Sequence, residues 1–343
     1  MPVVNQNTSE SHPDTFFPDQ TFYRACINGD LDQVERFLAE GVNVNAVMTY
    51  GFTALMLASK NGNKAIVERL INAGANLDAA CSTGATALFF AAQENNIDCL
   101  KLLISAGADL NARAKDGVTP LFTAAQKNNT ECVKLLINAG ADLNAARITD
   151  SATPLLAAAA KGNIDCVKLL INAGADIEAR TEDGATPLFI AAQKNNTECV
   201  KLLINAGADL NAARITDGAT PLLAAAAKGN IDCVKLLINA VIDLNARTKN
   251  SVTPLYVAAQ EGHTDCVELL INAGADLNAR NKNSATPLYI AAQEGHTDCV
   301  ELLINAGADL NAARTSDGAT PLSIAVAMGN TDCVEALIRA EAK

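Results

Sequence analysis

Cysteine is the residue in this sequence whose number and spacing first suggest chemistry. Eight of the ten cysteines recur at steps of 33 or 34 residues: Cys99, Cys132, Cys166, Cys199, Cys233, Cys266, Cys299 and Cys333. Thiols on helices stacked about 8–10 Å apart are too distant for disulfides, which need Cα atoms within about 7 Å. An earlier copy has Ile66 at this place, which indicates an apolar site. We therefore expect a column of buried, reduced thiols, and no metal ion or cofactor, because no Cys/His group has metal-ligand spacing.

Histidine and the other catalytic residue types give no better candidate for chemistry. Of the three histidines, His263 and His296 each follow a glycine within a repeated unit, where a hydrogen bond in a loop is the simpler explanation. No glycine-rich phosphate loop occurs, and each Ser or Asp with a nearby partner recurs in copy after copy. Residues reproduced in every unit serve stacking rather than a single site. We expect no enzymatic activity and assign no catalytic residue.

The elements that carry these residues are repeated along almost the whole chain. An anchor threonine recurs at steps of 33 or 34 residues, at Thr53, Thr86, Thr119, Thr153, Thr186, Thr220, Thr253, Thr286 and Thr320. A period of this size is typical of a stacked array, because one such unit cannot bury its apolar face alone. Residues 119–185 and 186–252 are near copies, each a pair of units.

Each unit predicts two short helices and a loop. In Thr253-Pro254-Leu255 the hydroxyl caps free N–H groups, and the proline suits the first helical turn. Gly262 ends this helix, and Thr264 is expected to cap the second one. The run Val267–Ile271 supplies an apolar stripe at helical spacing, and Gly274 closes the second helix in a left-handed conformation.

The pattern TPLxxAAxxGHxxxVxLLxxxGADxNA resembles the ankyrin repeat from residue 22 to about residue 340. The resemblance implies an all-α solenoid, elongated and curved, in which helix pairs are joined by β-hairpin fingers. Its usual activity is to bind other proteins through the concave face. The family's histidine after Thr-Pro-Leu is absent, and apolar packing between repeats is expected instead. Its place is taken by Met56, Phe89, Phe122, Leu156, Phe189, Leu223, Tyr256, Tyr289 and Ser323.

The domain organisation follows from the repeats. Residues 1–20 are polar and interrupted by prolines, which predicts a disordered lead. Residues 21–343 are expected to form one solenoid, with capping repeats at about 21–46 and 318–343. No apolar run approaches the roughly 18 residues of a membrane span, and no secretory signal is visible.

One unit has Val241-Ile242-Asp243 where the others have Gly-Ala-Asp. A β-branched residue in the left-handed conformation costs about 1–2 kcal/mol. We expect strain or a changed helix end at Val241.

Charge is distributed unevenly along the chain, whose net charge is −12. Residues 119–250 carry 13 Lys and Arg against 13 Asp and Glu, whereas residues 251–343 carry 5 against 12. At the end of the first helix, Lys127, Lys161, Lys194 and Lys228 give way to Glu261 and Glu294. Two explanations of this change stay open. The residues form a solvated face, or they contact a partner that is acidic opposite the middle of the chain and basic opposite its last third. Overall acidity argues against a nucleic-acid partner.

The candidate partner-binding residues lie at the ends of the first helices and in the fingers. Finger residues Ile148 and Ile215 either pack on the neighbouring finger or contact a partner, and both alternatives stay open. The arginines of the fingers lie near Asp or Glu in most repeats, which favours local ion pairs over phosphate binding. The set is Tyr50, Phe52, Gln93, Lys115, Gln126, Lys127, Ile148, Gln193, Lys194, Ile215, Lys249, Gln260, Glu261, Lys282, Gln293 and Glu294.

The resemblance implies a second class of function. The finger asparagines resemble those that an asparaginyl hydroxylase modifies in ankyrin repeats, although an Asn that bonds to its own backbone in a turn explains them equally well. The candidates are Asn111, Asn144, Asn211, Asn245, Asn278 and Asn311.

The sequence thus favours a non-catalytic scaffold, an adaptor or inhibitor that binds one partner protein as a monomer. Reduced thiols without a signal peptide indicate the cytoplasm. The near-identical copies resemble those of ankyrin proteins that intracellular bacteria deliver into host cells, and such an effector role is a further hypothesis.

Overall fold

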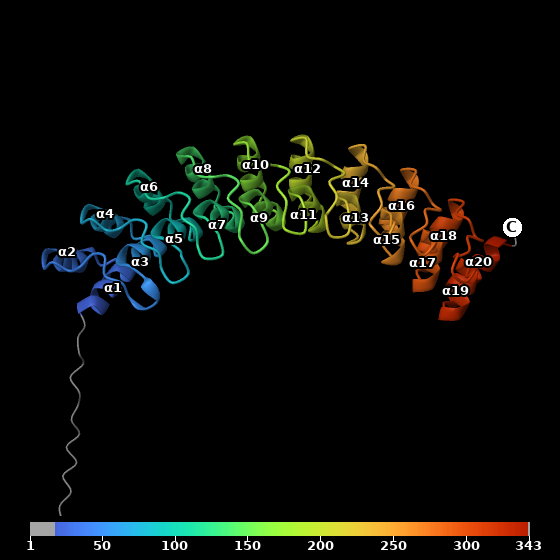
Figure 1. Cartoon of the computed structure of the whole chain (residues 1–343), viewed down its shortest axis with the longest axis horizontal. Coiled ribbons are helices and arrows are strands. Elements are labelled where there is room, and N and C mark those ends of the chain that lie inside the picture. The colour runs from blue at the N-terminus through green and yellow to red at the C-terminus, as the bar shows by residue number, and fades with distance from the viewer. Residues whose placement is uncertain (1–17, 342–343) are drawn as a thin grey trace, which may run out of the picture. The chain divides into compact units, whose positions relative to one another are not determined.

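The computed structural model of the chain describes residues 18–341, which form two compact units. Unit 1 ends at Lys115, and unit 2 begins at Asp116. All regular structure within the described residues is helical, which confirms the predicted all-α class (Figure 1). Residues 1–17 of the predicted disordered lead lie outside the described residues. The first helix already begins at Pro18, before the predicted boundary.

Unit 1 is built from three helix pairs in its described part. A short 3₁₀ turn, Thr49–Gly51, precedes the second pair. The helices are α1 (Pro18–Asn28), α2 (Leu31–Ala39), α3 (Ala54–Lys60), α4 (Lys64–Asn72), α5 (Ala87–Gln93) and α6 (Ile97–Ser105).

Unit 2 repeats the same pair seven times in its described part. Its first helices are α7 (Pro120–Lys127), α9 (Pro154–Lys161), α11 (Pro187–Gln193), α13 (Pro221–Ala226), α15 (Pro254–Gln260), α17 (Pro287–Glu294) and α19 (Pro321–Met328). Its second helices are α8 (Thr130–Ala139), α10 (Ile164–Asn172), α12 (Thr197–Asn205), α14 (Ile231–Asn239), α16 (Thr264–Asn272), α18 (Thr297–Asn305) and α20 (Thr331–Glu341). First helices pack on first helices and second helices on second helices.

The anchor threonine starts each first helix from α3 onward, as predicted. In α7 the Thr119 hydroxyl accepts a hydrogen bond from the N–H of Phe122 at 3.2 Å, and a proline occupies the first turn. The hydroxyl satisfies one of the N–H groups that a helix start leaves free, and the proline has no N–H to satisfy. In α19, Thr320 and Ser323 cap each other reciprocally.

The start of the second helix differs from the prediction. Thr264 lies inside α16, and the N-cap residue is His263, whose side chain makes no capping bond. Its ring instead reaches the preceding repeat, with Nε2 3.4 Å from the carbonyl oxygen of Ala227. Asn230 does the same for α14, donating to the carbonyls of Ala192 and Gln193 at 2.7 and 3.0 Å. This position therefore joins neighbouring repeats rather than capping its own helix.

The fingers are turns and not the β-hairpins that the resemblance implied, since no strand occurs in residues 18–341. Neighbouring fingers are joined by one or two backbone hydrogen bonds: the N–H of Ile148 donates to Asp116 at 2.7 Å, and the Asp183 carbonyl accepts from the N–H groups of Ile215 and Thr216 at 3.0 and 3.4 Å. Left-handed residues such as Ser151, at φ 60°, turn the chain within the finger.

The predicted thiol column is confirmed as part of the core. All ten cysteines are buried, and Cys132, Val133 and Leu136 of α8 are fully enclosed. Burial, with a smaller contribution from Glu131, raises the pKa of the Cys132 thiol to about 11. A thiol that stays protonated at neutral pH behaves as a small apolar side chain.

Val241 adopts the left-handed conformation expected from the sequence, with φ 61°, and its side chain is 90% exposed. The helix end changes as well. In the next unit the N–H of Ala275 donates to Leu270, but the corresponding bond from Ile242 to Leu237 is not formed in the described structure. The Leu237 carbonyl accepts from Ala240 instead, at 3.1 Å. The sequence predicted strain or a changed helix end, and the structure shows the left-handed Val241 together with a changed helix end.

Candidate functional site

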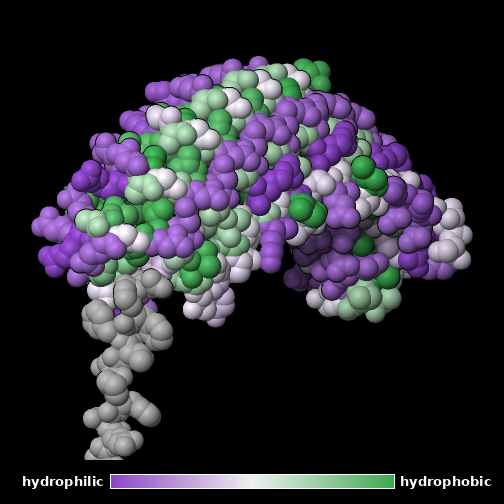
Figure 2. All heavy atoms as spheres, turned by 60° about the vertical axis from the view of Figure 1, so that its left-hand side comes forward, coloured by the Kyte–Doolittle hydropathy of each residue, from purple (hydrophilic) through white to green (hydrophobic). Residues whose placement is uncertain are grey.

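The predicted contact residues lie on the fingers and on the first helices, and we call these two elements together the finger-side surface. In unit 2 the fingers are residues 144–152, 178–185, 211–219, 245–252, 278–285 and 311–319. Figure 2 shows hydrophilic and apolar side chains in alternating bands on the face turned toward the viewer. Such bands follow from the repeats, because the same residue type recurs at the same position of successive repeats.

Unit 1 carries four of the predicted residues. Tyr50 is 72% exposed and left-handed, with φ 64°. Phe52 is half-buried, its ring centroid 5.4 Å from that of Phe90. Gln93 is half-buried, and Lys115 is exposed while its N–H donates to the carbonyl of Thr83 at 2.8 Å.

Unit 2 carries the other twelve predicted residues. The helix-end positions Lys127, Lys194, Glu261 and Glu294 are exposed, and the glutamines that precede them, Gln126, Gln193, Gln260 and Gln293, are half-buried. Lys249 and Lys282 are exposed on the fingers. The change from Lys to Glu therefore forms a single row on the finger-side surface, with Lys161 and Lys228 in the basic part.

Ile148 and Ile215 pack on the neighbouring finger, which is one of the two alternatives left open by the sequence; contact with a partner stays a prediction. Ile215 lies against the glycine of the preceding finger, since a Cβ placed on Gly184 would come within 2.5 Å of its Cγ1. The side chains remain 68% exposed for Ile148 and 60% for Ile215. Each isoleucine packs on its neighbour with one edge, and the rest of its apolar surface is exposed.

Three fingers hold an arginine over an aromatic ring of the preceding first helix. Arg214 stacks on Phe189, with its Cζ 4.9 Å from the ring centroid, and its Nε and Nη2 donate to Asp217 at 3.0 and 2.6 Å. Asp183 adds an ion pair at 3.6 Å. The hydrogen bonds to Arg214 lower the pKa of the Asp217 carboxyl. Equivalent stacks join Arg147 with Phe122 and Asp150, and Arg314 with Tyr289 and Asp317.

The predicted local pairing of the finger arginines is thus confirmed for these three. Other fingers bind their arginine differently. Arg180 donates to the carbonyl of Ala213 at 3.0 Å, and Arg280 donates to that of Ala313 at 2.8 Å. The arginine here ties one finger to the next through the backbone.

A hollow of about 300 Å³ opens on the finger-side surface of unit 2, beside α13. Phe189, Leu223 and Ala224 are its buried apolar residues, while Val252 and Val257 are partly buried. Its polar lining residues are Gln193, Arg214, Asp217, Lys228 and Thr248. Among these only Gln193 belongs to the predicted set.

Small side chains on α13 explain the hollow. The fourth residue after the anchor threonine is Ala224 here, but Ile190 in the unit before and Val257 in the unit after. The seventh is Ala227, where both neighbours have glutamine. In unit 2, α13 and α15 are also the least closely packed pair of neighbouring first helices. The same two alanines recur as Ala157 and Ala160 in α9, so comparing these positions between repeats would have indicated both α9 and α13 from the sequence.

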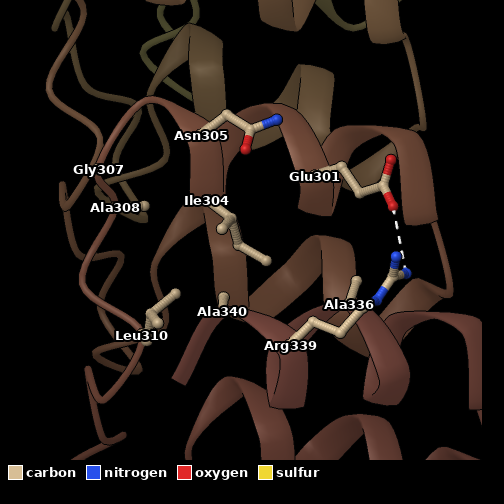
Figure 3. A pocket seen from close by; sticks show the side chains of 9 residues that line it. All are labelled: Glu301, Ile304, Asn305, Gly307, Ala308, Leu310, Ala336, Arg339 and Ala340. Carbon is tan, nitrogen blue, oxygen red and sulfur yellow. Dashed lines mark ion pairs between the residues drawn. The ribbon is translucent and has the colours of Figure 1, made fainter. Parts of the chain in front are cut away.

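A second, larger groove of about 700 Å³ lies away from the fingers, between α18, the loop after it and α20 (Figure 3). Ile304, Leu310 and Ala336 line it, and Glu301 points toward Arg339, with an N···O distance of 3.6 Å. It contains none of the predicted residues. Within residues 18–341, no group of three or more His, Cys, Asp or Glu side chains could hold a metal ion.

Four of the finger asparagines, Asn144, Asn211, Asn245 and Asn278, bond differently from the prediction. The Asn245 side chain does not bind its own backbone; its Oδ1 accepts from the N–H of Asp276 in the next repeat at 2.9 Å. The turn is ordered by an aspartate instead, since Asp243 Oδ1 accepts from the N–H of Asn245 at 2.9 Å. All six candidates, Asn111, Asn144, Asn211, Asn245, Asn278 and Asn311, are exposed.

Three features of the structure allow comparison with known families: the helix pairs, the anchor threonines and the linked fingers. A family model described as ankyrin repeats matches residues 22–114, 108–181, 145–214, 211–281 and 255–343. The chain belongs to the ankyrin repeat family. Ankyrin repeats generally mediate protein–protein interaction and are typically not catalytic. A search of curated proteins finds no match to this ankyrin array.

In the ankyrin array, the missing family histidine is replaced by apolar packing, as expected. Phe122, Phe189 and Tyr289 are almost fully buried at that position. Ser323, in the last repeat, is exposed and serves the helix cap instead. Within the described residues, no helix is both long and apolar enough to cross a membrane.

Proposed function

We propose that this ankyrin array is a non-catalytic scaffold, an adaptor or inhibitor that binds a partner protein on its finger-side surface. The observation that carries the proposal is the hollow beside α13, where the partly buried Val252 and Val257 lie beside buried apolar side chains and are ringed by polar residues. This is the arrangement of a protein-binding hot spot, in which an apolar anchor is surrounded by groups that exclude water. The exposed Ile148 and Ile215 add apolar contact area.

A net charge of −12 favours a protein over a nucleic acid as the partner. We also propose that the protein acts as a monomer. We place it in the cytoplasm as part of the proposal, since buried thiols are compatible with a reducing compartment. Action inside a host cell is a narrower hypothesis, and it rests on the near-identical copies alone.

Affinity capture from a cytosolic extract tests the scaffold function. A finger-side variant, Gln193→Ala with Lys194→Ala and Gln260→Ala, is compared with Lys168→Ala and Lys235→Ala, which change exposed lysines of second helices. We expect the control to retain the captured proteins and the finger-side variant to lose them. Equal capture by both variants would contradict the proposal.

As a second function we propose that the array is a substrate of an asparaginyl hydroxylase. The favouring observation is that all six candidate asparagines are exposed. Co-expression with such a hydroxylase followed by mass spectrometry tests it, and a gain of one oxygen per modified site is expected. Unmodified peptides at all six positions would exclude it.

A further inference from the structure

The charge row and the hollow of unit 2 meet at one place. Lys161 ends α9, Lys194 directly follows α11, and Lys228 lies two residues after α13; all three are exposed. Glu261 and Glu294, the corresponding residues of α15 and α17, are exposed too. The sign of the row changes between Lys228 and Glu261. Lys228 lines the hollow, and Val257 of α15 forms its other side. The charge therefore reverses across the hollow.

The hollow suits an aliphatic side chain. Its volume of about 300 Å³ is many times the roughly 30 Å³ of one water molecule. Phe189, Leu223 and Val257 provide apolar contacts on different sides. Arg214 is fixed by Phe189 and Asp217, so this wall is rigid before a partner arrives. A preorganised wall lowers the entropic cost of binding.

The spacing of the charges suits an extended chain. Neighbouring helices lie about 8–10 Å apart, and an extended chain advances about 3.3–3.6 Å per residue, so one repeat corresponds to about three residues. The charge on the fingers changes sign as well, from acidic at Glu182 to basic at Lys249 and Lys282, which is the opposite order to that of the helix ends. A segment that crossed this surface in the wrong direction would place like charges together along both edges, which opposes binding.

We propose that unit 2 binds an extended segment of the partner protein that inserts one aliphatic side chain into the hollow beside α13. Toward the helix ends, the segment carries acidic residues opposite Lys194 and Lys161 and basic residues opposite Glu261 and Glu294. Successive charged residues of one sign are about three positions apart. This inference rests on the proposed scaffold function and specifies the chemistry and direction of the partner.

The chain contains a matched pair of variants for the test. Ala224→Ile fills the hollow with the residue type that Ile190 and Ile290 already supply at this helix position. Ala157→Ile makes the same change in the near copy 67 residues upstream, where the alanine is equally buried. Both variants should fold, and circular dichroism with thermal unfolding verifies this. A charge pair, Lys194→Glu with Lys228→Glu, is matched by Lys168→Glu with Lys235→Glu on second helices.

The probe is a phage-displayed library of random peptides selected against the full chain. We expect enriched peptides to have an aliphatic residue with acidic residues on one side and basic residues on the other. Ala224→Ile should weaken binding of the selected peptides about tenfold or more, because one buried aliphatic side chain is worth at least that factor. The Lys194/Lys228 pair should weaken binding about tenfold or more as well, because it places like charges together. Ala157→Ile and the Lys168/Lys235 pair should leave binding unchanged.

Other outcomes separate this inference from the scaffold function. Peptides that bind the Ala224→Ile variant normally but are lost in the Lys194/Lys228 variant would overturn the hollow and leave the finger-side surface intact. Equal losses in Ala157→Ile and Ala224→Ile would also overturn the hollow. Peptides sensitive only to the Lys168/Lys235 pair, or a library without any binder, would count against both proposals.

Discussion

The guanidinium of Arg214 lies over the ring of Phe189 in a finger that is one residue longer than those of the preceding and following units. The three units of 34 residues all contain Asn-Ala-Ala-Arg in the finger, and all three place the arginine on an aromatic ring. In a shorter finger, Arg280 donates to the backbone of Ala313 instead, although its unit has Tyr256 at the aromatic position. A single added residue thus changes the role of the arginine from linking fingers to covering the core.

Acid should weaken the array through the aspartates of these stacks. The bonds to arginine lower the pKa of Asp150 and Asp217, and that of Asp317 falls to about 2. A carboxyl with a lowered folded-state pKa adds stability above its unfolded pKa of about 3.9, and this stability is lost as pH falls toward the folded value. The variant with Asp150→Asn, Asp217→Asn and Asp317→Asn should therefore show a smaller drop in Tm between pH 5 and pH 2. A drop as large as that of the unchanged chain would contradict this assignment.

Replacing Val241 by glycine should stabilise unit 2. Relief of the left-handed strain is worth about 1–2 kcal/mol, and the greater freedom of glycine in the unfolded chain takes back about 0.4–1 kcal/mol. We expect a net gain of about 1 kcal/mol in the free energy of unfolding, measured by urea denaturation. Gly274→Val is the reverse control, since a Cβ there meets no atom within 4 Å and only the backbone is strained. It should lose a similar amount, and a stabilised control would refute the strain argument.

Two tyrosines at equivalent positions should respond oppositely to loss of the hydroxyl. The Tyr289 hydroxyl is buried without a hydrogen-bond partner, whereas that of Tyr256 accepts from Asn281 Nδ2 at 3.0 Å. Tyr289→Phe recreates the arrangement of Phe189 under Arg214 and should be neutral or stabilising. Tyr256→Phe should cost about 0.5–1.5 kcal/mol, the net worth of one hydrogen bond. Thermal unfolding of both variants tests the contrast, and equal effects would remove it.

Ser59 is a candidate for stabilising unit 1. Its hydroxyl is fully buried without a partner, and the same helix position is alanine in most other repeats, including Ala192. A buried polar group left unsatisfied costs about 1–3 kcal/mol, so Ser59→Ala should raise the free energy of unfolding by about 1 kcal/mol or more. Ala192→Ser places the same group in unit 2 and should lower stability. If Ser59→Ala proves destabilising, the hydroxyl has a partner in solution.

Sequence reasoning succeeded where a residue's role is settled inside its own repeat. The cap at Thr119, the burial of Cys132 and the left-handed Val241 all follow from local geometry and periodicity. It failed where the partner lies in another repeat. Asn245 was expected to bond to its own backbone, yet its side chain bonds to the next repeat, and the loop hydrogen bond expected of His263 reaches the preceding repeat. The hollow at Ala224 was missed for a related reason: it arises from a difference between neighbouring repeats, whereas the family pattern records what they share.

The column of enclosed sulfur atoms has a consequence for measuring the motions of this protein. Most repeats contain one cysteine at the same depth, so each reacts with an alkylating reagent only while its own part of the stack is open. The burial of Cys99, Cys199 and Cys266 raises the pKa of each thiol to about 11, which keeps the background reaction slow. Peptide mapping after timed exposure to the reagent would rank the repeats by opening frequency without any engineered cysteine. The segment around Val241 should open first.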